Sequence, residues 1–262
     1  MIDLHVHVLP GLDDGPGTLD EAVEMCRTAA EDGIAVLVAS PHMYNGCFDV
    51  ARRDVLAGVA SLEAALEEAG VSVSIVPAAE LGLNEDLARL IREGEAVTLG
   101  EGDRYVLVEL GPYDTMAAAV RILHEVQLAG PTPILIHPER NLEVQCNPDA
   151  LMPAILAGNL VQCTAGSLTG YFGKAARRCV GELLQRGMVH VIASDAHDAV
   201  RRRPVLSPAR DIVRRLRGED EARRLFEENP RRLLDGRPVE VPAPVRKPAG
   251  RFRELLGAWW KP

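Results

Sequence analysis

Cysteine is scarce in this sequence, and long apolar runs are absent. Its 262 residues include five cysteines, an odd number, and no two of them form a Cys-x-x-Cys pair. A disulfide framework and a zinc ribbon are therefore not expected. No run of 18 apolar residues occurs, and Met1 leads directly into a strand pattern rather than into a basic and then apolar leader. We therefore expect no transmembrane helix and no signal peptide, and predict a cytoplasmic protein.

An excess of basic charge is also missing. Lysine and arginine number 29 against 38 acidic residues, which gives a net charge of −9 at pH 7. This balance argues against a nucleic-acid partner. The hydrophobic share is 47%, and a length of 262 residues lies within the size of a single α/β barrel. One catalytic domain is therefore the expectation.

Short apolar runs alternate with amphipathic segments along most of the chain. We predict seven strands, over residues 2–8, 34–40, 71–79, 105–110, 133–137, 160–163 and 188–194. Helices are predicted between them, over residues 19–32, 50–69, 85–92, 114–129, 148–157 and 174–186. Thr18 and Glu21 have the spacing of a capping box, and Gly33 ends that first helix. Apolar strands separated by helices are typical of a parallel sheet covered on both faces, so the pattern predicts a (β/α) barrel or a doubly wound sheet.

Two histidines alternate with apolar residues in the first predicted strand. Because side chains of a strand alternate between its two faces, His5 and His7 should project to one side. The apolar residues should line the other side: Leu4, Val6 and Val8. On its own, a His-x-His motif fits a metal site and a pair of core histidines equally well.

Most of the predicted strands end in a histidine or an acidic residue. With one acid from the loop after the first strand, the set is His5, His7, Asp14, His42, Glu80, Glu109, His137, Asp195 and His197. The C-terminal ends of parallel strands converge on the face where active sites lie, so these side chains should meet in space. Such mixed nitrogen and oxygen donors suit two or three divalent ions, with Mn²⁺, Fe²⁺ or Zn²⁺ favoured over Ca²⁺ or Cu⁺.

The charge of this cluster points to a phosphate ligand. Its four carboxylates contribute −4, and three divalent ions would change this to about +2, which attracts phosphate. Arg140 and Arg203 follow proposed ligands closely in the sequence, and either could hold a phosphoryl group through two parallel hydrogen bonds. An exposed, solvated arginine is the commoner role, so this interpretation depends on the neighbouring ligands.

Several blocks of the sequence carry a resemblance to a known superfamily. They are residues 3–15 (DLHVHVLPGLDDG), 39–42 (ASPH), 80–81 (EL), 137–140 (HPER), 165–173 (AGSLTGYFG) and 193–197 (ASDAH). Through these blocks the chain resembles the polymerase-and-histidinol-phosphatase (PHP) superfamily, and within it the bacterial manganese-dependent protein-tyrosine phosphatases of the CpsB/CapC/YwqE type. The acidic pair in the first loop and the Gly-Ser-Leu-Thr-Gly segment favour this branch over histidinol-phosphate phosphatases.

The resemblance implies a fold and a ligand set. The fold would be a distorted (β/α)7 TIM-like barrel, the PHP fold, over residues 1–236. The resemblance does not extend to residues 237–262, where the sequence itself predicts a Pro-rich linker and a short amphipathic tail. Three divalent ions, preferably Mn²⁺ and alternatively Fe or Zn, would be held as follows: the first by His5, His7, Glu80 and Asp195, the second by Glu80, Glu109 and His137, and the third by Asp14, His42 and His197. Tyr171 and Asn141 depart from the family pattern, at positions where an arginine and an aromatic residue are commoner.

The implied activity is hydrolysis of phosphotyrosine on a membrane-associated bacterial tyrosine kinase that controls capsule or exopolysaccharide synthesis. A hydroxide bridging two ions would attack phosphorus without a covalent phosphoenzyme, and the catalytic set would be completed by Arg140, Arg203, His42 and His197. The enzyme would be cytoplasmic or peripheral at the inner membrane, and a homo-oligomer is left open. The alternative within the superfamily is a histidinol-phosphate phosphatase or another small-molecule phosphomonoesterase or phosphodiesterase.

Two further hypotheses come from other classes of protein. Residues 47–53 satisfy Cys-x5-Arg, the spacing of cysteine-dependent tyrosine phosphatases, but the bulky and acidic residues between Cys47 and Arg53 do not suit a phosphate-cradling loop. A binding module without activity is disfavoured by the complete ligand set. In the tail, a helix would dock on the barrel or contact a membrane, a partner kinase or a second copy, through one face formed by Phe252, Leu255, Leu256 and Trp259.

Overall fold

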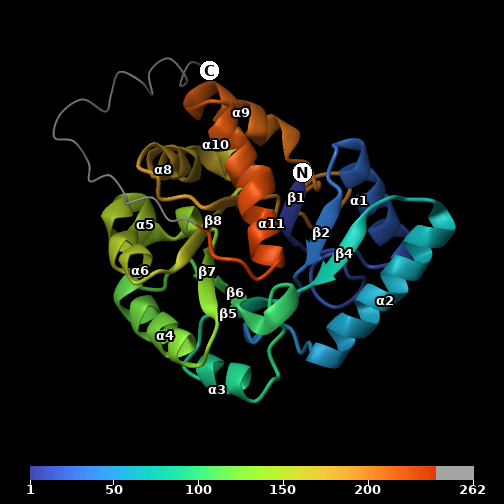
Figure 1. Ribbon diagram of the computed structural model, residues 1–262, viewed down its shortest axis with the longest axis horizontal. Coiled ribbons are helices and arrows are strands. Elements are labelled where there is room, and N and C mark those ends of the chain that lie inside the picture. Colours follow the sequence, from blue (N-terminus) through green and yellow to red (C-terminus); the bar gives the residue numbers. More distant parts are fainter. Residues whose placement is uncertain (240–262) are drawn as a thin grey trace.

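Seven parallel strands form a ring at the centre of the computed structural model, which describes residues 1–239 (Figure 1). Two of the seven are each interrupted for two residues, at 40–41 and 78–79, so nine shorter strands are distinguished in this part of the chain. They are β1 (Ile2–Val6), β2 (Val36–Ala39), β3 (His42–Met43), β4 (Ser74–Pro77), β5 (Glu80–Gly82), β6 (Tyr105–Glu109), β7 (Thr132–Ile136), β8 (Leu160–Thr164) and β9 (Val191–Ala193).

Backbone hydrogen bonds run around the whole ring. One parallel sheet contains β1, β2 and β4, and another contains β3, β5, β6, β7, β8 and β9. Because β3 continues β2 and β5 continues β4, the two sheets are joined through these strands. The remaining gap lies between β9 and β1, where the N–H of Asp195 donates to the carbonyl oxygen of His5 at 2.9 Å. The N–H of His7 donates to Ala196 at the same distance, 2.9 Å, so the ring closes and the predicted (β/α)7 TIM-like barrel is confirmed.

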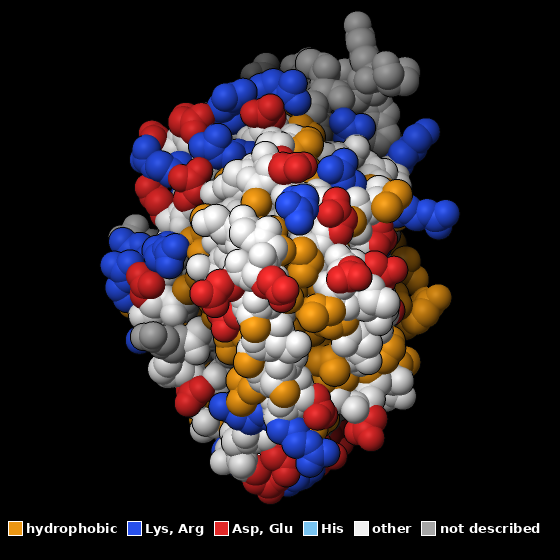
Figure 2. Space-filling model, turned by 90° about the vertical axis from the view of Figure 1, so that its right-hand side faces the viewer, with side chains coloured by type: hydrophobic (Ala, Val, Ile, Leu, Met, Phe, Trp, Pro, Cys, Tyr) orange, Lys and Arg blue, Asp and Glu red, His pale blue; other side chains and the backbone are white. Residues whose placement is uncertain are grey.

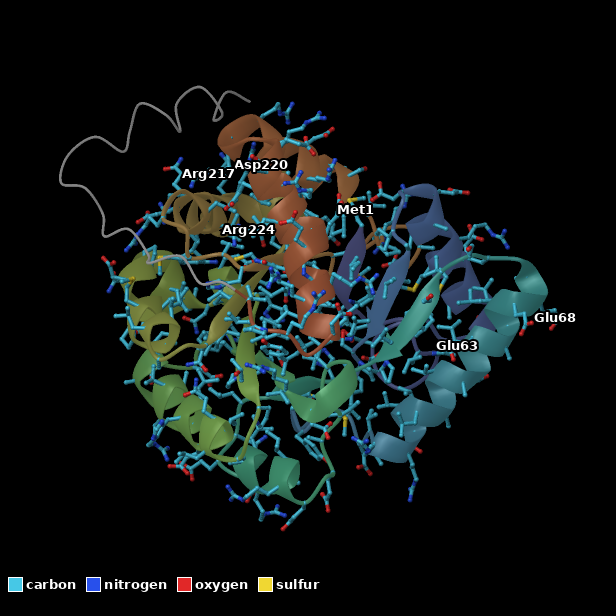
Figure 3. The ribbon with its side chains drawn as sticks, in the orientation of Figure 1. Met1, Glu63, Glu68, Arg217, Asp220 and Arg224 are labelled. Carbon is cyan, nitrogen blue, oxygen red and sulfur yellow. The ribbon has the colours of Figure 1, made fainter. Side chains whose placement is uncertain are left out.

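Helices cover the outside of the ring (Figure 1). They are α1 (Leu19–Glu31), α2 (Arg52–Ala69), α3 (Leu87–Arg92), α4 (Met116–Leu128), α5 (Leu142–Cys146), α6 (Met152–Leu156), α7 (Ala165–Thr169), α8 (Gly173–Gln185), α9 (Ser207–Arg217), α10 (Glu219–Arg223) and α11 (Asn229–Leu234). The buried positions of α2 recur every three or four residues, at Val55, Val59, Leu62 and Leu66. Glu63 and Glu68 of the same helix are exposed, and Glu68 points away from the barrel (Figure 3).

Helix ends follow local sequence signals. The hydroxyl of Thr18 accepts the N–H of Glu21 at 3.3 Å, and the Glu21 carboxylate accepts the N–H of Thr18 at 3.2 Å, so the predicted capping box is confirmed. The single helix predicted over residues 148–157 is wrong: a 3₁₀ turn, Pro148–Leu151, precedes α6. Pro153 lacks the N–H that a continuous α-helix would need there. No helix is predicted between residue 186 and the tail, whereas the structure places α9, α10 and α11 there.

The inward face of the strands changes from apolar to polar along the axis of the ring. Its apolar end is closed by Leu233 and Leu234 of α11 and contains Ile2, Leu4, Val36, Val38, Ala78, Tyr105, Leu107, Ile134, Ile136, Leu160, Val191 and Ala193. Along these strands the next inward position lies two residues further on, and there the side chains are polar: Ser40, Glu80, Glu109, Gln162 and Asp195. A second apolar cluster packs between the strands and the helices. The fold therefore places a cluster of polar side chains at the C-terminal end of the strands, above a layer of apolar side chains.

The first strand departs from regular alternation. Its register against β2 shifts part-way along β1. Leu4 packs in the inward cluster, whereas Val6 and Val8 pack in the outer one. The prediction that these three residues share a face is therefore wrong, because the irregularity changes the phase of the strand. His5 and His7 nevertheless project into the ring together, with their Nε2 atoms 3.1 Å apart.

His190, just before β9, is buried without charge. Its Nδ1 accepts the N–H of Val161 at 2.9 Å, and its carbonyl oxygen accepts the side chain of Asn229 at 2.7 Å. Burial, and to a smaller degree Arg224, lower the pKa of His190 to about 4. The neutral imidazole is therefore part of the folded structure at neutral pH.

Acidification is expected to destabilise the fold partly through His190. The pKa of His190 is about 6.5 in the unfolded chain, above its value in the folded protein, so the unfolded chain binds the proton first. The free energy of unfolding therefore decreases as the pH falls from about 6.5 towards 4. The shift corresponds to about 3 kcal/mol. In His190→Asn, whose Oδ1 can still accept the Val161 hydrogen bond, this part of the loss should disappear. Urea unfolding of both proteins at neutral and acidic pH measures it, and an equal loss in both would contradict the assignment.

Two expectations concern the surface and the tail. Within residues 1–239, no helix has both the length and the apolar character needed to cross a membrane. On the face that Figure 2 shows, acidic and basic side chains are interspersed, which gives no support to a nucleic-acid surface there. The predicted amphipathic tail helix lies outside the described residues, as does the linker from residue 240 onward.

Candidate metal centre

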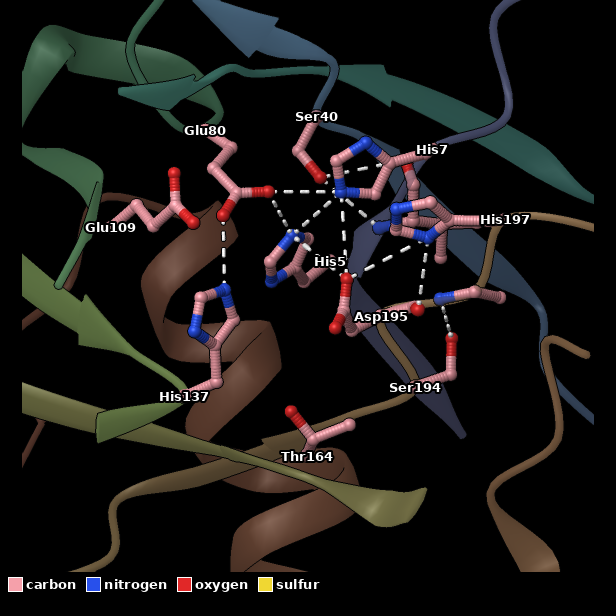
Figure 4. A network of polar contacts seen from close by, with 12 residues as sticks. His5, His7, Ser40, Glu80, Glu109, His137, Thr164, Ser194, Asp195 and His197 are labelled. Carbon is pink, nitrogen blue, oxygen red and sulfur yellow. Dashed lines mark hydrogen bonds and ion pairs between the residues drawn. The ribbon is translucent and has the colours of Figure 1, made fainter. Parts of the chain in front are cut away.

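Histidine and carboxylate side chains meet at the C-terminal end of the ring (Figure 4). Their donor atoms fall into three overlapping groups, and within each group they lie within 4.8 Å of one another. The groups are His5, His7, Glu80 and Asp195; His42, Glu80 and Glu109; and His7, Asp14, His42 and His197. The remaining predicted ligand, His137, adjoins them through its Nε2, which lies 2.9 Å from Oε1 of Glu80. The structure thus brings all the ligands predicted from the sequence to one place.

The imidazoles of His5 and His7 are both held at Nδ1. The Nδ1 of His7 lies 2.6 Å from Oδ2 of Asp13, and the Nδ1 of His5 lies 3.2 Å from Oε1 of Gln162. The amide nitrogen of Gln162 donates to the carbonyl oxygen of Cys163 at 2.9 Å, which leaves the amide oxygen facing His5. Both partners are acceptors, so each Nδ1 carries a hydrogen, and Nε2 is the ring atom that can bind a metal ion once it is deprotonated.

The two Nε2 atoms face one another across a short gap. They are 3.1 Å apart, and each lies 2.9 Å from the same atom, Oε2 of Glu80. Oδ1 of Asp195 is 3.6 Å from the Nε2 of His5 and 3.5 Å from that of His7. Nitrogen and oxygen atoms this close need a positive charge among them, from a proton on Nε2 or from a metal ion, and the neighbouring carboxylates raise the pKa of both histidines against the effect of burial. Two imidazoles and two carboxylates are a donor set that fits a divalent metal ion.

Glu80 faces two groups of ligands at once. It is 1% exposed, with Oε2 towards His5 and His7 and Oε1 towards His137. Burial acts to raise the pKa of Glu80, but the contacts with His5 and His137 hold that pKa well below its usual range. Burial and the charge of Glu80 raise the pKa of Glu109 to about 7. A carboxylate that is ionised and shared in this way is suited to bridge two metal ions.

His137 and Asp195 follow strand ends with an unusual backbone. Their φ angles are 36° and 54°, in the left-handed region that residues other than glycine rarely adopt. Ile136 of β7 points inward, so regular alternation would direct the next side chain towards the helices. The left-handed turn instead brings His137 inward to Glu80.

Two histidines and an acid form the outer part of the centre. The Nε2 atoms of His42 and His197 lie 3.6 and 3.3 Å from Oδ1 of Asp14. Burial and the neighbouring His7 lower the pKa of His197 to about 3. The ring of Phe48 stacks on His42, with centroids 5.5 Å apart and planes 2° from parallel. His197 is therefore neutral at physiological pH, which keeps a lone pair for a cation.

Two guanidinium groups reach Asp195 next to the histidines. Arg140 pairs with its Oδ2 and donates to the hydroxyl of Thr164 at 2.7 Å. Arg202 donates to the same Oδ2 at 2.7 Å and to the carbonyl oxygen of Asp195 at 3.0 Å. The ring of Phe172 lies against both, 3.9 Å from the central guanidinium carbon of Arg140 and 5.7 Å from that of Arg202. These planar donors are suited to hold phosphoryl oxygens beside the carboxylates.

Comparison with known proteins places this arrangement in a family. Residues 1–235 match the family described as capsular polysaccharide synthesis, CpsB/CapC. The chain belongs to the CpsB/CapC family. It is 30% identical to tyrosine-protein phosphatase YwqE of Bacillus subtilis over 260 residues, 98% of this chain and 99% of YwqE. It is 26% identical to tyrosine-protein phosphatase CpsB of Streptococcus pneumoniae over 239 residues, 89% of this chain and 98% of CpsB.

Solved structures agree with the family assignment. A crystal structure reported for YwqE and CpsB, described as unique metal-dependent tyrosine phosphatases, superimposes with a TM-score of 0.87 at 30% identity, over 94% of this chain and all of the other. A dihydropyrimidinase from Brevibacillus agri and the lactonase Lmo2620 from Listeria monocytogenes give TM-scores of 0.52 and 0.53 at 13% and 12% identity. These two share the barrel fold alone.

In this CpsB/CapC family member, Arg202 is the arginine of the 201–203 run that contacts Asp195. Arg203 is exposed and lines a cavity of about 200 Å³, whereas the contact comes from Arg202. Three consecutive arginines were the available signal, but only the folded loop distinguishes them. Asp13 and Gln162 were also missed. The acidic pair 13–14 gave a hint of the first, and nothing local distinguished the second from an ordinary strand residue.

The cysteine-dependent alternative gains no support from the structure. Cys47 is exposed. The side chain of Arg53 is 87% exposed and pairs with Asp54 at 3.5 Å, so it points into solvent. Residues 47–53 therefore form no cradle in which both groups face one phosphate.

The two departures from the family pattern occupy different settings. Asn141 is buried and caps the start of α5, where its side-chain oxygen accepts the N–H of Val144 at 3.1 Å. It also donates to the carbonyl oxygens of Gly111 and Asp114, each at 2.8 Å. Asn141 therefore ties the segment after Arg140 to the loop after β6. Tyr171 is 57% exposed on the wall of the cavity that Arg203 lines.

Proposed function

We propose that this protein is a metal-dependent protein-tyrosine phosphatase, a phosphoric monoester hydrolase. The observation that carries the proposal is the convergence of the Nε2 atoms of His5 and His7 on Glu80, next to Arg140 and Arg202. The histidine nitrogens and the Glu80 carboxylate can bind a metal cation, and the two guanidinium groups can donate hydrogen bonds to phosphoryl oxygens. The names of YwqE and CpsB as tyrosine-protein phosphatases support phosphotyrosine as the substrate.

Three divalent ions are proposed for the centre. The first would be held by His5, His7, Glu80 and Asp195, the second by Glu80, Glu109 and His137, and the third by Asp14, His42 and His197. Mixed imidazole and carboxylate donors favour Mn²⁺, with Fe and Zn as alternatives. The chemistry that such ions supply is activation of water and neutralisation of phosphoryl charge.

The side chains of the protein would orient the phosphoryl group. Arg140 and Arg202 would exchange Oδ2 of Asp195 for phosphoryl oxygens, while Phe172 keeps their planes in place. Phenolate, with a pKa of about 10, needs less help from an acid than an alkoxide does. Burial lowers the pKa values of His42 and His197, which suits neutral ligands better than proton donors.

A phosphorylated tyrosine kinase at the membrane is the proposed physiological substrate. The family description, capsular polysaccharide synthesis, supports this class of partner. The cavity beside Asp195 is lined by the aromatic side chains of Tyr171 and Phe172 and by the cationic side chain of Arg202. This lining would suit the ring of a phosphotyrosine and acidic residues next to it in a peptide. Such an enzyme would act in the cytoplasm or at the inner surface of the membrane.

Substrate class can be tested with matched phosphate esters. The Mn²⁺-loaded protein would be assayed on a phosphotyrosine peptide, on the same peptide with phosphoserine, and on histidinol phosphate. We expect kcat/KM to be highest for phosphotyrosine, by about tenfold or more. Preferential turnover of histidinol phosphate would replace the proposal by the superfamily alternative. Absence of hydrolysis of all three would reject both.

Replacing Arg140 with lysine is expected to lower kcat/KM by about ten- to a thousandfold, the range for losing one transition-state donor. Lysine keeps the charge but loses the planar pair of donors and the stacking on Phe172. Metal content should not change. Kinetics on a phosphotyrosine peptide, with elemental analysis, check both points, and Arg53→Lys on the exposed start of α2 is the matched control. Wild-type kinetics in the Arg140 variant would show that this arginine only balances Asp195.

A further inference from the structure

Asp13 sits beside a proposed metal ligand but faces away from solvent. Its side chain is fully enclosed, whereas that of its neighbour Asp14 is 49% exposed. The Oδ2 atom of Asp13 lies 2.6 Å from Nδ1 of His7 and accepts the backbone N–H of His42 at 3.0 Å. Its Oδ1 accepts the N–H of Gly15 at 3.0 Å. One carboxylate therefore joins the end of β1, the first loop and the start of β3.

The first loop is packed so that Asp13 stays in place. A Cβ at Gly15 would lie 2.6 Å from the carbonyl oxygen of His7 and 3.1 Å from Oδ1 of Asp13. No side chain fits there, so the loop backbone rests directly against the histidine. This close contact does not depend on the hydrogen bonds of Asp13, and it holds the first loop in the same position against His7.

We propose that Asp13 is a positioning residue that sets the affinity of the centre for divalent metal ions. It acts through His7 and His42 and is not itself a ligand. By accepting the Nδ1 hydrogen, it leaves the lone pair of His7 on Nε2, the atom that faces Glu80. By accepting the backbone N–H of His42, Asp13 also fixes the position from which the His42 imidazole reaches the centre. The inference rests on the proposed metal-dependent function.

The partner of His5 gives a contrast within the same centre. Its Nδ1 faces the neutral amide of Gln162 at 3.2 Å, whereas His7 has a carboxylate at 2.6 Å. A carboxylate makes the imidazole a stronger donor to metal than an amide does. Asp13 should therefore matter more for metal affinity than Gln162.

Asparagine cannot reproduce these contacts in either orientation. With its amide NH₂ towards Gly15, two donors face each other. With its NH₂ towards His7, the imidazole must accept at Nδ1, and the hydrogen moves to Nε2, inside the centre. Removing a partner of this kind lowers metal affinity by about 10- to 100-fold.

The experiment measures Mn²⁺ affinity of the full chain by competition with a fluorescent chelator. We expect Asp13→Asn to weaken at least one Mn²⁺ binding step by about 10- to 100-fold. Asp13→Glu, which keeps the carboxylate but displaces it, should fall between that variant and the wild type. Glu63→Gln, the same chemical change on the exposed side of α2, should bind Mn²⁺ like the wild type.

Equal affinity of Asp13→Asn and the wild type would overturn the proposal. Thermal unfolding without metal shows whether the asparagine variant is folded. If it is not, the glutamate variant decides: weaker Mn²⁺ binding than in Glu63→Gln supports the proposal, and equal binding overturns it. The proposed function fails separately, if the Mn²⁺-loaded wild type does not hydrolyse phosphotyrosine whatever its metal affinity.

Discussion

Removing divalent metal ions with a chelator is expected to abolish hydrolysis of phosphotyrosine, and adding Mn²⁺ is expected to restore it. Four carboxylates at the centre, Asp14, Glu80, Glu109 and Asp195, outweigh the two guanidinium groups of Arg140 and Arg202. A phosphorylated tyrosine carries a charge of about −1.5 to −2, and without the ions the centre loses the positive charge that would neutralise it and the activation of water. The loss should reach at least about a thousandfold, the upper range for a single lost transition-state donor.

The measurement is turnover of a phosphotyrosine peptide after treatment with EDTA, dialysis and titration with Mn²⁺. Cys47→Ser is the informative companion variant, because Cys47 is exposed and Arg53 does not face it. This variant should behave like the wild type in every step. Turnover that survives the chelator but is lost in Cys47→Ser would instead establish a cysteine nucleophile.

Local patterns in the sequence were enough to place the strands but not to close the ring. The strand predicted over residues 105–110 is β6, Tyr105–Glu109, and that over 160–163 is β8, Leu160–Thr164. Closure depends on two hydrogen bonds between residues far apart in the chain, from Asp195 to His5 and from His7 to Ala196, which no local period reveals. Residues 219–234 form one helical stretch in which a π-helical segment, Arg224–Glu228, joins α10 to α11, and this segment breaks the regular 3.6-residue period that local patterns reveal.

The candidate site divides in the same way between what is local and what is not. Glu80 and Glu109 could be predicted because each follows an apolar run at a strand end. The partners that orient the histidines could not. Gln162 occupies an ordinary strand position, and its role depends on His5 reaching it across the ring. Asp13 could not be told from Asp14, because the two differ only in the direction that the folded loop gives them.

Replacing Glu80 with alanine is expected to be the most damaging single change at the centre. Both of its oxygens are used, Oε2 by His5 and His7 and Oε1 by His137, and only 1% of the residue is exposed. Without Glu80, the proposed ions lose the carboxylate that they would share beside the Nε2 atoms of His5 and His7. The ions would then repel each other across a weakened site. Metal content should fall below that of the wild type by at least one ion per chain, and kcat/KM by about a thousandfold or more.

Elemental analysis of the purified variant, with kinetics on a phosphotyrosine peptide, tests this expectation. Glu80→Gln keeps the volume of the side chain and loses only the charge, so a matching loss of metal there shows that the effect is not due to a cavity. Glu63→Ala, on the exposed side of α2, controls for the loss of an acidic residue. Unchanged metal content in Glu80→Ala would exclude Glu80 as a bridge, because a carboxylate that serves two ions cannot be removed without releasing at least one of them.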